Sequence, residues 1–438
     1  MFKLTLATFA ILLVVVASVS ATIQHYYDHS VYRVRPSNVM QLSMLQKLVE
    51  DGDVDFWREP DQINRFADVM LRPDNKDKIL KFFDDNLIAY NLIISDVEKI
   101  IERERNEQLA VDEQLKTRAD ARPHNEAVAG FWKKYQNFNS HANFVAKLAE
   151  QNPEIVQKVQ FGSSHEKRPL VAALIGEKPN SSKKAIWIEG GIHAREWISP
   201  ATVTYFAQQL VNLYNEKDPT VQDLLKYYDF YIVPVLNADG YEYSHTNDRL
   251  WRKTRRPSTS KPTCIGADPN RNFGYQWGGT GASTNPCSET YRGDSAFSEP
   301  ETRAESDYIL KNLKGRLASF IAVHSYGQYW LYPWGWTSAV TKDDAKLNKV
   351  AKAAVAALNK VSMSTKFTIG TSTNVLYAAA GGSDDWAYGS ANCTYSYTVE
   401  LRDTGYYGFQ LPASLILPTA TETTAAFLEL ASSIKSAK

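Results

Sequence analysis

Residues 185–197 read Ala185-Ile186-Trp187-Ile188-Glu189-Gly190-Gly191-Ile192-His193-Ala194-Arg195-Glu196-Trp197. The apolar, β-branched run predicts a buried strand, and the glycine pair predicts a sharp turn or a close approach of another segment. A His and a Glu three positions apart, just past a strand, can hold one divalent cation through an imidazole nitrogen and a carboxylate oxygen. Because so short a pattern also occurs in ordinary surface loops, its interpretation depends on residues further along the chain.

Strand-like and helical runs alternate around this stretch from Phe131 onward. The expected strands are 156–160, 170–175, 185–189, 228–236, 317–324, 367–370 and 395–401. The expected helices are 142–151, 199–214, 298–313, 343–361, 382–388 and 415–437. This alternation predicts an α/β domain with a mixed, mainly parallel twisted sheet, helices on both faces, and ligands at the strand ends.

The segment 22–105 has a different rhythm. Its expected strands are 31–34, 54–57, 67–71 and 90–94, and its expected helices are 39–49 and 74–86. The order βα-β-β-αβ predicts a small α+β domain, an open, ferredoxin-like sandwich with two helices on one antiparallel sheet.

A charged run at 97–116 predicts a helix that is polar on nearly every side, which typically bridges two domains. We expect a connecting segment over 106–122. Such exposed linkers are where proteolysis concentrates. The Arg122-Pro123 bond should resist a trypsin-like protease, so Arg118 is the expected cleavage point of an activation segment. An ordinary interdomain linker is the alternative.

Composition limits the function classes. The 438 residues suit about two domains, and 49 basic residues balance 49 acidic ones, so no nucleic-acid partner is expected. A lysine at position 3, an apolar run and a small-residue ending predict a signal peptide over 1–21. That run is shorter than the ~20 residues that a membrane span needs. We therefore expect a soluble, secreted, extracellular protein.

Export makes disulfides possible. Of the three cysteines, Cys264 and Cys287 bracket a Gly/Pro/Asn-rich region, and closing such a loop contributes about 3 kcal/mol. Cys393 is then expected to be a small buried hydrophobic residue. Asn180 and Asn392 begin N-glycosylation sequons, which are used only where they are exposed.

Further candidate groups stand at the ends of later strands. His324 follows a buried apolar run, where a His is also commonly a hydrogen-bonded core residue. With His193 and Glu196 it makes a His2Glu set that leaves one position for water, as in catalytic zinc sites. Glu400 ends another strand, and a buried Glu near a metal can take a proton from the attacking water. Pairing of Glu400 with Arg402 is the alternative.

Five motifs occur in order: His193-Ala194-Arg195-Glu196, Asn270-Arg271-Asn272, His324-Ser325-Tyr326, Gly381-Gly382-Ser383 and Glu400-Leu401-Arg402-Asp403-Thr404-Gly405. Together they resemble the pancreatic-type zinc metallocarboxypeptidases, the secreted procarboxypeptidase A/B family. The resemblance implies a catalytic domain over 123–438, an inhibitory prodomain over 22–105 and one Zn²⁺ per chain. It also implies a zinc-dependent exopeptidase that hydrolyses the C-terminal peptide bond of peptides, made as a monomeric zymogen for a digestive lumen and activated by a trypsin-like protease.

The resemblance also assigns roles to residues. His193, Glu196 and His324 match the zinc ligands, and Glu400 matches the general base. Arg252 matches the guanidinium that stabilises the oxyanion, since attack on a carbonyl develops negative charge.

Other residues match substrate contacts. Asn270 and Arg271 match the pair that grips the terminal carboxylate, for which the planar guanidinium is suited. Asp268 matches the carboxylate that orients a ligating His. The remaining matches are Arg195, Ser325, Tyr326, Tyr377 and Phe409. Simple aromatic packing is the alternative for the last three.

Asp384 carries the expected specificity. In this family the first acid of the pair Asp384-Asp385 sits at the base of the side-chain pocket of the B type. A carboxylate in a closed pocket is costly unless a cation pairs with it, so a C-terminal Lys or Arg is expected. Asp384 could instead pair with an internal base or cap the following helix.

Gly335 and Ser372 depart from the B-type pattern. An A-type or broad carboxypeptidase that releases aromatic or aliphatic residues is therefore an alternative. A non-catalytic peptide-binding homologue is a further one, and the presence of all three ligands, Glu400 and Arg252 argues against it.

Overall fold

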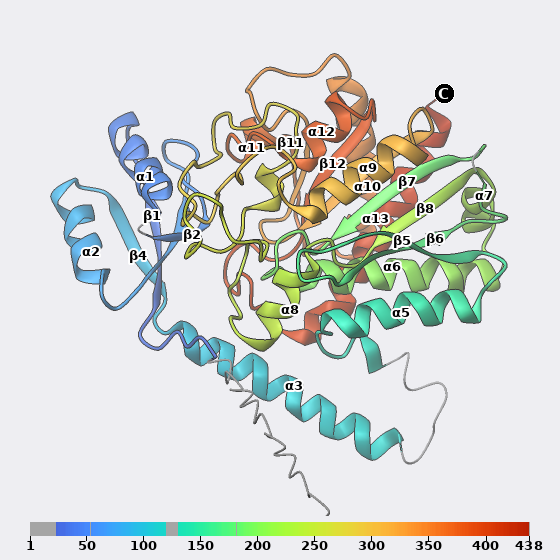
Figure 1. Ribbon diagram of the computed structural model, residues 1–438, viewed down its shortest axis with the longest axis horizontal. Helices are drawn as coiled ribbons and strands as arrows, with labels where there is room; N and C mark the ends of the chain where they lie inside the picture. The colour runs from blue at the N-terminus through green and yellow to red at the C-terminus, as the bar shows by residue number, and fades with distance from the viewer. Residues whose placement is uncertain (1–22, 53, 120–129, 181, 438) are drawn as a thin grey trace, which may run out of the picture.

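The computed structural model describes residues 23–52, 54–119, 130–180 and 182–437, and the expected signal peptide over 1–21 lies outside them. Figure 1 shows a small N-terminal domain beside a large α/β domain, with the long helix α3 leading from one to the other. None of the helices in these ranges combines the length and the apolar character that a membrane span requires.

The N-terminal domain has the expected order of elements. They are β1 (Ser30–Arg35), α1 (Val39–Asp51), β2 (Asp55–Arg58), β3 (Ala67–Leu71), α2 (Lys76–Asp85) and β4 (Ala89–Ile94). The strands pair antiparallel in the order β2-β3-β1-β4. Helix α1 begins where the Asn38 side chain accepts a hydrogen bond from the Gln41 N–H, and it ends at Gly52 in the left-handed conformation.

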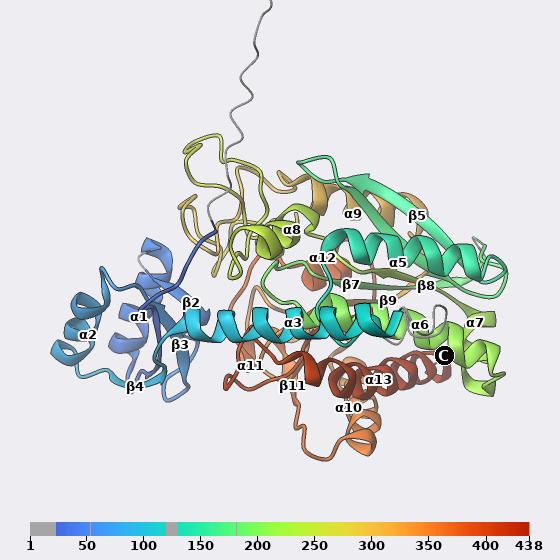
Figure 2. The ribbon, with the colours of Figure 1, turned by 90° about the horizontal axis from the view of Figure 1, so that it is seen from below.

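Helix α3 (Val97–Ala119) is longer than expected. The sequence suggested an end at Lys116, but the helix continues for three more residues. Arg118, the expected cleavage point, therefore lies in its last turn. The rest of the expected connecting segment, from residue 120, lies outside the described residues. Figure 2 shows α3 running along the large domain.

The large domain is built on one eight-stranded sheet. Its strands are β5 (Val156–Ser163), β6 (Pro169–Ile175), β7 (Lys184–Gly190), β8 (Tyr228–Val233), β9 (Leu317–His324), β10 (Tyr329–Tyr332), β11 (Thr368–Thr371) and β12 (Tyr395–Glu400). They lie in the order β11-β10-β12-β9-β7-β8-β6-β5. The central pairs β12-β9, β9-β7 and β7-β8 are parallel, as is β10-β11, and the other pairs are antiparallel. The mixed, mainly parallel sheet is confirmed.

Helices cover both faces of this sheet. One face carries α5 (Phe138–Gln151), α6 (Ile198–Asn215), α7 (Pro219–Tyr227), α10 (Asp344–Val361) and α13 (Ile416–Ser436). The other carries α9 (Pro300–Asn312) and α12 (Ser383–Gly389). Two short helices, α8 (Ala238–Thr246) and α11 (Ser372–Val375), lie in the connections.

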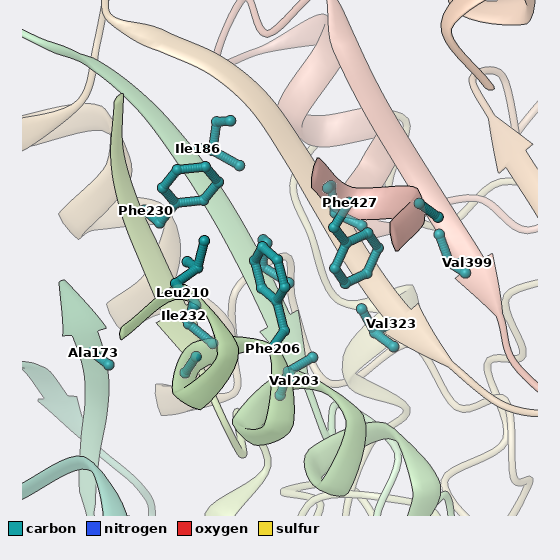
Figure 3. Packing of buried hydrophobic residues seen from close by; sticks show 14 of the residues in the cluster. Ala173, Ile186, Val203, Phe206, Leu210, Phe230, Ile232, Val323, Val399 and Phe427 are labelled. Atoms are coloured by element: carbon teal, nitrogen blue, oxygen red, sulfur yellow. The ribbon is translucent and has the colours of Figure 1, made fainter. Parts of the chain in front are cut away.

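Strand β7 lies between these two layers and is buried on both faces. Ile186 packs with Phe206 of α6 and Phe230 of β8 in the larger apolar cluster (Figure 3). Trp187 and Tyr231 belong to the cluster on the opposite face, as the alternation of side chains along a strand requires. The buried strand expected at 185–189 is confirmed.

Some elements differ from the expectation. Strand β10 and helices α7, α8 and α11 were not predicted; β10 and α11 are only four residues long, too short to show a period. Strand β8 ends at Val233 rather than at residue 236, because Pro234 has no N–H to donate to the ladder. The disulfide Cys264–Cys287 is present, and Cys393 is a buried free cysteine, as expected.

Candidate metal centre and active site

Parallel strand ends bring the metal-ligand candidates together. Gly190 of β7 pairs with Val323 of β9, and His324 pairs with Glu400 of β12, so these strands end at one edge. Gly191 has φ of +61°, and a Cβ there would lie 3.2 Å from the Val235 Cα. The glycine pair thus makes the turn that carries the chain from β7 to His193.

His193, Glu196 and His324 form a buried cluster whose ligand atoms all lie within 4.8 Å of one another. The Nδ1 atom of His193 lies 2.7 Å from Glu196 Oε1, and the Nδ1 atom of His324 lies 3.1 Å from Glu196 Oε2. The two Nδ1 atoms are 3.2 Å apart. Two imidazole nitrogens and a carboxylate that converge in this way match the donor set of a catalytic zinc site.

The charges in this cluster favour a cation. Burial lowers the pKa of His193, and Arg252 lowers it further, so this imidazole stays neutral and can ligate. Burial also disfavours the cationic form of His324, but the Glu196 carboxylate outweighs burial and raises the pKa of His324 to about 9. The negative charge of Glu196 that favours the protonated form of His324 would attract a metal cation in the same way.

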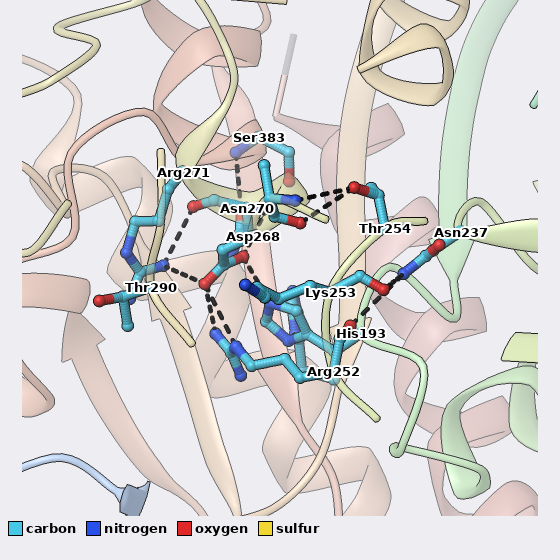
Figure 4. Close-up of polar contacts among 12 residues, drawn as sticks. His193, Asn237, Arg252, Lys253, Thr254, Asp268, Asn270, Arg271, Thr290 and Ser383 are labelled. Carbon is cyan, nitrogen blue, oxygen red and sulfur yellow. Dashed lines mark hydrogen bonds and ion pairs between the residues drawn. The ribbon is translucent and has the colours of Figure 1, made fainter. Parts of the chain in front are cut away.

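Asp268 fixes the orientation of His193 from behind. Its Oδ1 lies 3.0 Å from His193 Nε2, the nitrogen that faces away from Glu196. Its Oδ2 accepts hydrogen bonds from Arg252 Nη2 at 2.7 Å and Nε at 3.2 Å, as Figure 4 shows. Although burial alone would raise the pKa of Asp268, Arg252 and His193 hold it well below its usual range. The carboxylate therefore stays charged and holds both neighbours in place.

Asn270 and Arg271 form a short 3-10 turn beside Asp268. Asn270 Oδ1 accepts a hydrogen bond from the Ser383 N–H at 2.9 Å. Arg271 donates through Nε to the Gly281 carbonyl, and its Nη2 lies 3.6 Å from Glu59 Oε1 of the N-terminal domain. Both residues line the pocket that contains the metal cluster.

Glu400 lies at the end of β12, in the same pocket. Burial raises its pKa to about 8, and the nearby Glu196 raises it as well, against His324 and Arg252. The alternative pairing with Arg402 is wrong, because Arg402 Nε donates to Glu422 at 2.8 Å instead. Glu400 is therefore a carboxylate close to the metal cluster that can accept and release a proton near neutral pH.

Asp384, Gly335 and Ser372 also line this pocket. Asp384 is 6% exposed, and its Oδ1 and Oδ2 accept hydrogen bonds from the Asp385 N–H and the Ser372 hydroxyl, both neutral donors. Asp385 is instead held by the N–H groups of Gly335 and Trp336. Burial raises the pKa of Asp384, as expected for a carboxylate that lacks a cationic partner.

The remaining candidates lie where the two domains meet. Tyr326 and Phe409 line the pocket and pack edge to face at 5.1 Å. The Arg195 guanidinium lies 4.3 Å from the Phe409 ring centre and donates to Asp55 of β2 at 2.7 Å. Tyr377 lines the pocket, with the guanidinium of Arg271 5.8 Å from its ring centre. Ser325 donates its backbone N–H to Glu196 Oε2.

The sequence did not predict how the N-terminal domain covers this pocket. Trp57 and Arg58 of β2 are part of the pocket lining. Trp57 packs on Phe409 at 5.4 Å, while Asp55 and Glu59 contact two arginines of the large domain. The only available signal was a cluster of acidic and aromatic residues at the end of an expected short strand.

Known proteins resemble this chain over most of its length. The family model described as zinc carboxypeptidase matches residues 141–426, and the one described as carboxypeptidase activation peptide matches residues 32–104. A carboxypeptidase B from Astacus astacus is 46% identical over 292 residues, which cover 67% of this chain and 94% of the relative. Carboxypeptidase A1 from Sus scrofa is 36% identical over 93% of this chain and 94% of the relative.

Solved structures agree. The crystal structure of thrombin activatable fibrinolysis inhibitor superimposes with a TM-score of 0.80 at 32% identity, over 94% of this chain and 100% of the other. Relatives of both the A and the B name match at similar identity over nearly the full length, which identifies the family but leaves the preferred C-terminal residue open. The chain therefore belongs to the zinc carboxypeptidase family, as a metallocarboxypeptidase that uses one Zn²⁺ and carries the family's activation peptide.

Proposed function

We propose that this metallocarboxypeptidase removes C-terminal Lys and Arg residues from peptides, and that it is an exported zymogen activated by trypsin-like cleavage near Arg118. The observation that carries the specificity is the buried Asp384 carboxylate in the pocket lining, whose hydrogen-bond donors are neutral. A guanidinium or ammonium group of the substrate would supply the missing cation. The adjacent Asp385 is a weaker candidate, because it is not part of the pocket lining and accepts hydrogen bonds from the Gly335 and Trp336 N–H groups.

In this proposal His193, Glu196 and His324 hold the zinc ion, which supplies Lewis-acid polarisation of the scissile carbonyl and activation of water. Glu400 takes a proton from the attacking water and passes it to the leaving amine. Arg252, which Asp268 holds in place, would stabilise the oxygen on which negative charge develops.

The remaining residues restrict the enzyme to chain ends. Arg271 and the Asn270 amide would bind the terminal carboxylate, because a planar guanidinium and an amide N–H can share its two oxygens. Tyr377 would close over the substrate. Arg195, Ser325, Tyr326 and Phe409 would contact residues that precede the cleaved bond.

The N-terminal domain supports the zymogen proposal. Glu59 lies 3.6 Å from Arg271, where a substrate carboxylate would bind, and Asp55 engages Arg195. A peptide could not reach these arginines while the domain is seated. Export is supported by the disulfide Cys264–Cys287, since such bonds persist in oxidising compartments.

A broad or A-type preference is the second candidate. Gly335 and Ser372, both small residues, line the pocket together with Asp384, and a pocket with small lining residues could also admit an aromatic side chain. Turnover of hippuryl-Arg and hippuryl-Phe by the trypsin-treated chain distinguishes the two. Faster hydrolysis of the Phe substrate would replace the proposal with this candidate.

A further inference from the structure

Two buried carboxyl groups meet behind the pocket, on the sheet face that α9 and α12 cover. Glu189 is near the end of β7, and Glu305 lies on α9. Both side chains are fully buried. Neither has a role in the proposed chemistry. From the sequence, Glu189 was expected in a strand and Glu305 in a helix, with no functional role for either.

Within the part of the chain that the structure describes, two of the four carboxyl oxygens of this pair accept a hydrogen bond, and the other two do not. Glu189 Oε1 accepts a hydrogen bond from the Ser383 hydroxyl at 2.8 Å, and Glu305 Oε1 accepts one from the Trp187 indole N–H at 2.5 Å. Each Oε2 is buried and receives no hydrogen bond from the described residues, although the two carboxyl groups are close electrostatic neighbours. A hydrogen bond between two carboxyl groups requires that one of them carry a proton. A proton on one of them is therefore the donor that could link the pair.

The electrostatics favour retention of that proton. Burial and the neighbouring Glu189 raise the pKa of Glu305 well above its usual range. Burial also raises the pKa of Glu189, although a hydrogen bond from a protonated Glu305 and the one from Ser383 oppose this. Two like charges in contact and away from water repel each other strongly, so the pair favours a state in which at least one carboxyl group keeps its proton.

Ser383 connects this pair to the pocket. It is the first residue of α12, and it donates through two separate groups. Its hydroxyl donates to Glu189, and its backbone N–H donates to Asn270 Oδ1, the contact drawn in Figure 4. With its oxygen engaged, the Asn270 amide can offer only its N–H groups to a ligand in the pocket that it lines.

An apolar residue at position 305 would pack against Trp187 without the cost of burying an acid. Instead, Glu305 of α9 lies beside Glu189, Glu189 accepts from Ser383, and Ser383 donates to Asn270, which is proposed to bind substrate. We propose that the proton-sharing pair Glu189–Glu305 holds Ser383, and through it the Asn270 amide, in the orientation that binds the substrate's terminal carboxylate. Glu305 is thus a positioning residue, and this inference rests on the proposed function.

The test uses the full chain, treated with trypsin, and three variants. Glu305→Leu removes the proton and the partner of Glu189. Glu305→Gln keeps both contacts, because its amide can donate to Glu189 and accept from Trp187. Glu301→Gln is the matched control, a buried acid of the same helix that accepts from the His165 N–H instead. The measured quantities are KM and kcat on hippuryl-Arg, and inhibition by free arginine and by agmatine, which lacks the carboxylate.

We expect Glu305→Leu to raise KM and the inhibition constant of arginine about tenfold, as for loss of one well-oriented hydrogen bond to a charge. The kcat and the inhibition constant of agmatine should change by less than about threefold, since the base and Asp384 stay in place. Glu305→Gln should recover most of the lost affinity, and Glu301→Gln should match the wild type in all four quantities.

Three results would overturn the inference: equal weakening of arginine and agmatine, a Glu305→Gln variant as weak as Glu305→Leu, or a Glu305→Leu variant no different from Glu301→Gln. If Glu305→Leu does not fold, Ser383→Ala breaks the same link, and it should raise KM for hippuryl-Arg without a matching fall in kcat. A wild-type chain that does not cleave hippuryl-Arg would instead refute the proposed function itself.

Discussion

Glu104 on α3 and Arg249 of the large domain form a buried ion pair between the activation peptide, matched over residues 32–104, and the enzyme. Arg249 Nε and Nη2 donate to the two carboxylate oxygens at 2.6 and 3.0 Å, and the two side chains are 6% and 8% exposed. Replacing Glu104 with Gln leaves the guanidinium without its counter-charge, which costs about 3 kcal/mol at the low end of the range for buried pairs. The low end applies because Arg249 also donates to the Phe409 and Arg195 carbonyls.

This cost weakens the seated form of the N-terminal domain relative to the released one by about 100-fold. We therefore expect uncleaved Glu104→Gln protein to show much higher activity on hippuryl-Arg than uncleaved wild type, and trypsin treatment to bring both to the same level. The matched control is Asp112→Asn on the same helix, where Asp112 is 37% exposed and pairs with Lys134. Exposed pairs contribute about 0–1 kcal/mol, so this variant should stay inhibited. Equal activity of the two uncleaved variants would refute the reasoning.

Three further predictions concern the site. Asp384→Ala should lower kcat/KM for hippuryl-Arg about 100-fold and leave hippuryl-Phe within about threefold, because only the basic substrate loses a buried charge partner; an equal loss on both substrates would contradict the pocket assignment. The kcat/KM should fall as the pH falls, because Glu400 must be ionised to act as a base. The midpoint should lie between 4.5 and about 8, since a bound cation lowers the raised pKa of Glu400. A kcat/KM that does not change at acid pH would count against Glu400 as the base. A chelator should abolish activity and lower Tm, and added Zn²⁺ should restore both. At a free Zn²⁺ concentration of about 1,000 times its Kd, binding should stabilise the protein by about 4 kcal/mol. The activity and Tm of the His193→Ala variant should not respond to Zn²⁺.

Local patterns predicted the central strands and the metal cluster. The run 185–188 is apolar on both sides because β7 lies between two helical layers, and such a strand can be recognised in the sequence. His193 and Glu196 follow the end of β7, and His324 is the last residue of β9. Neighbouring parallel strands bring these ends together. The same reasoning placed Glu400 at the site, although its companion Arg402 belongs to a separate pair with Glu422.

Contacts between distant segments could not be predicted in this way. Nothing local to Asp55 or Glu59 indicates that they face Arg195 and Arg271, because the position of one domain on another depends on surfaces rather than periodicity. Glu305 resembles any acid on an amphipathic helix, and only its burial beside Glu189 reveals it. Helix α3 passes its expected end by Thr117, Arg118 and Ala119, of which Arg and Ala have high helix propensity.

The most direct test of the account is the ratio of kcat/KM for hippuryl-Arg to that for hippuryl-Phe, measured on the trypsin-treated wild-type chain with Zn²⁺ present. The buried Asp384 carboxylate, with only neutral donors around it, predicts that the Arg substrate is favoured by about 100-fold or more. A ratio below one would contradict the proposed basic specificity.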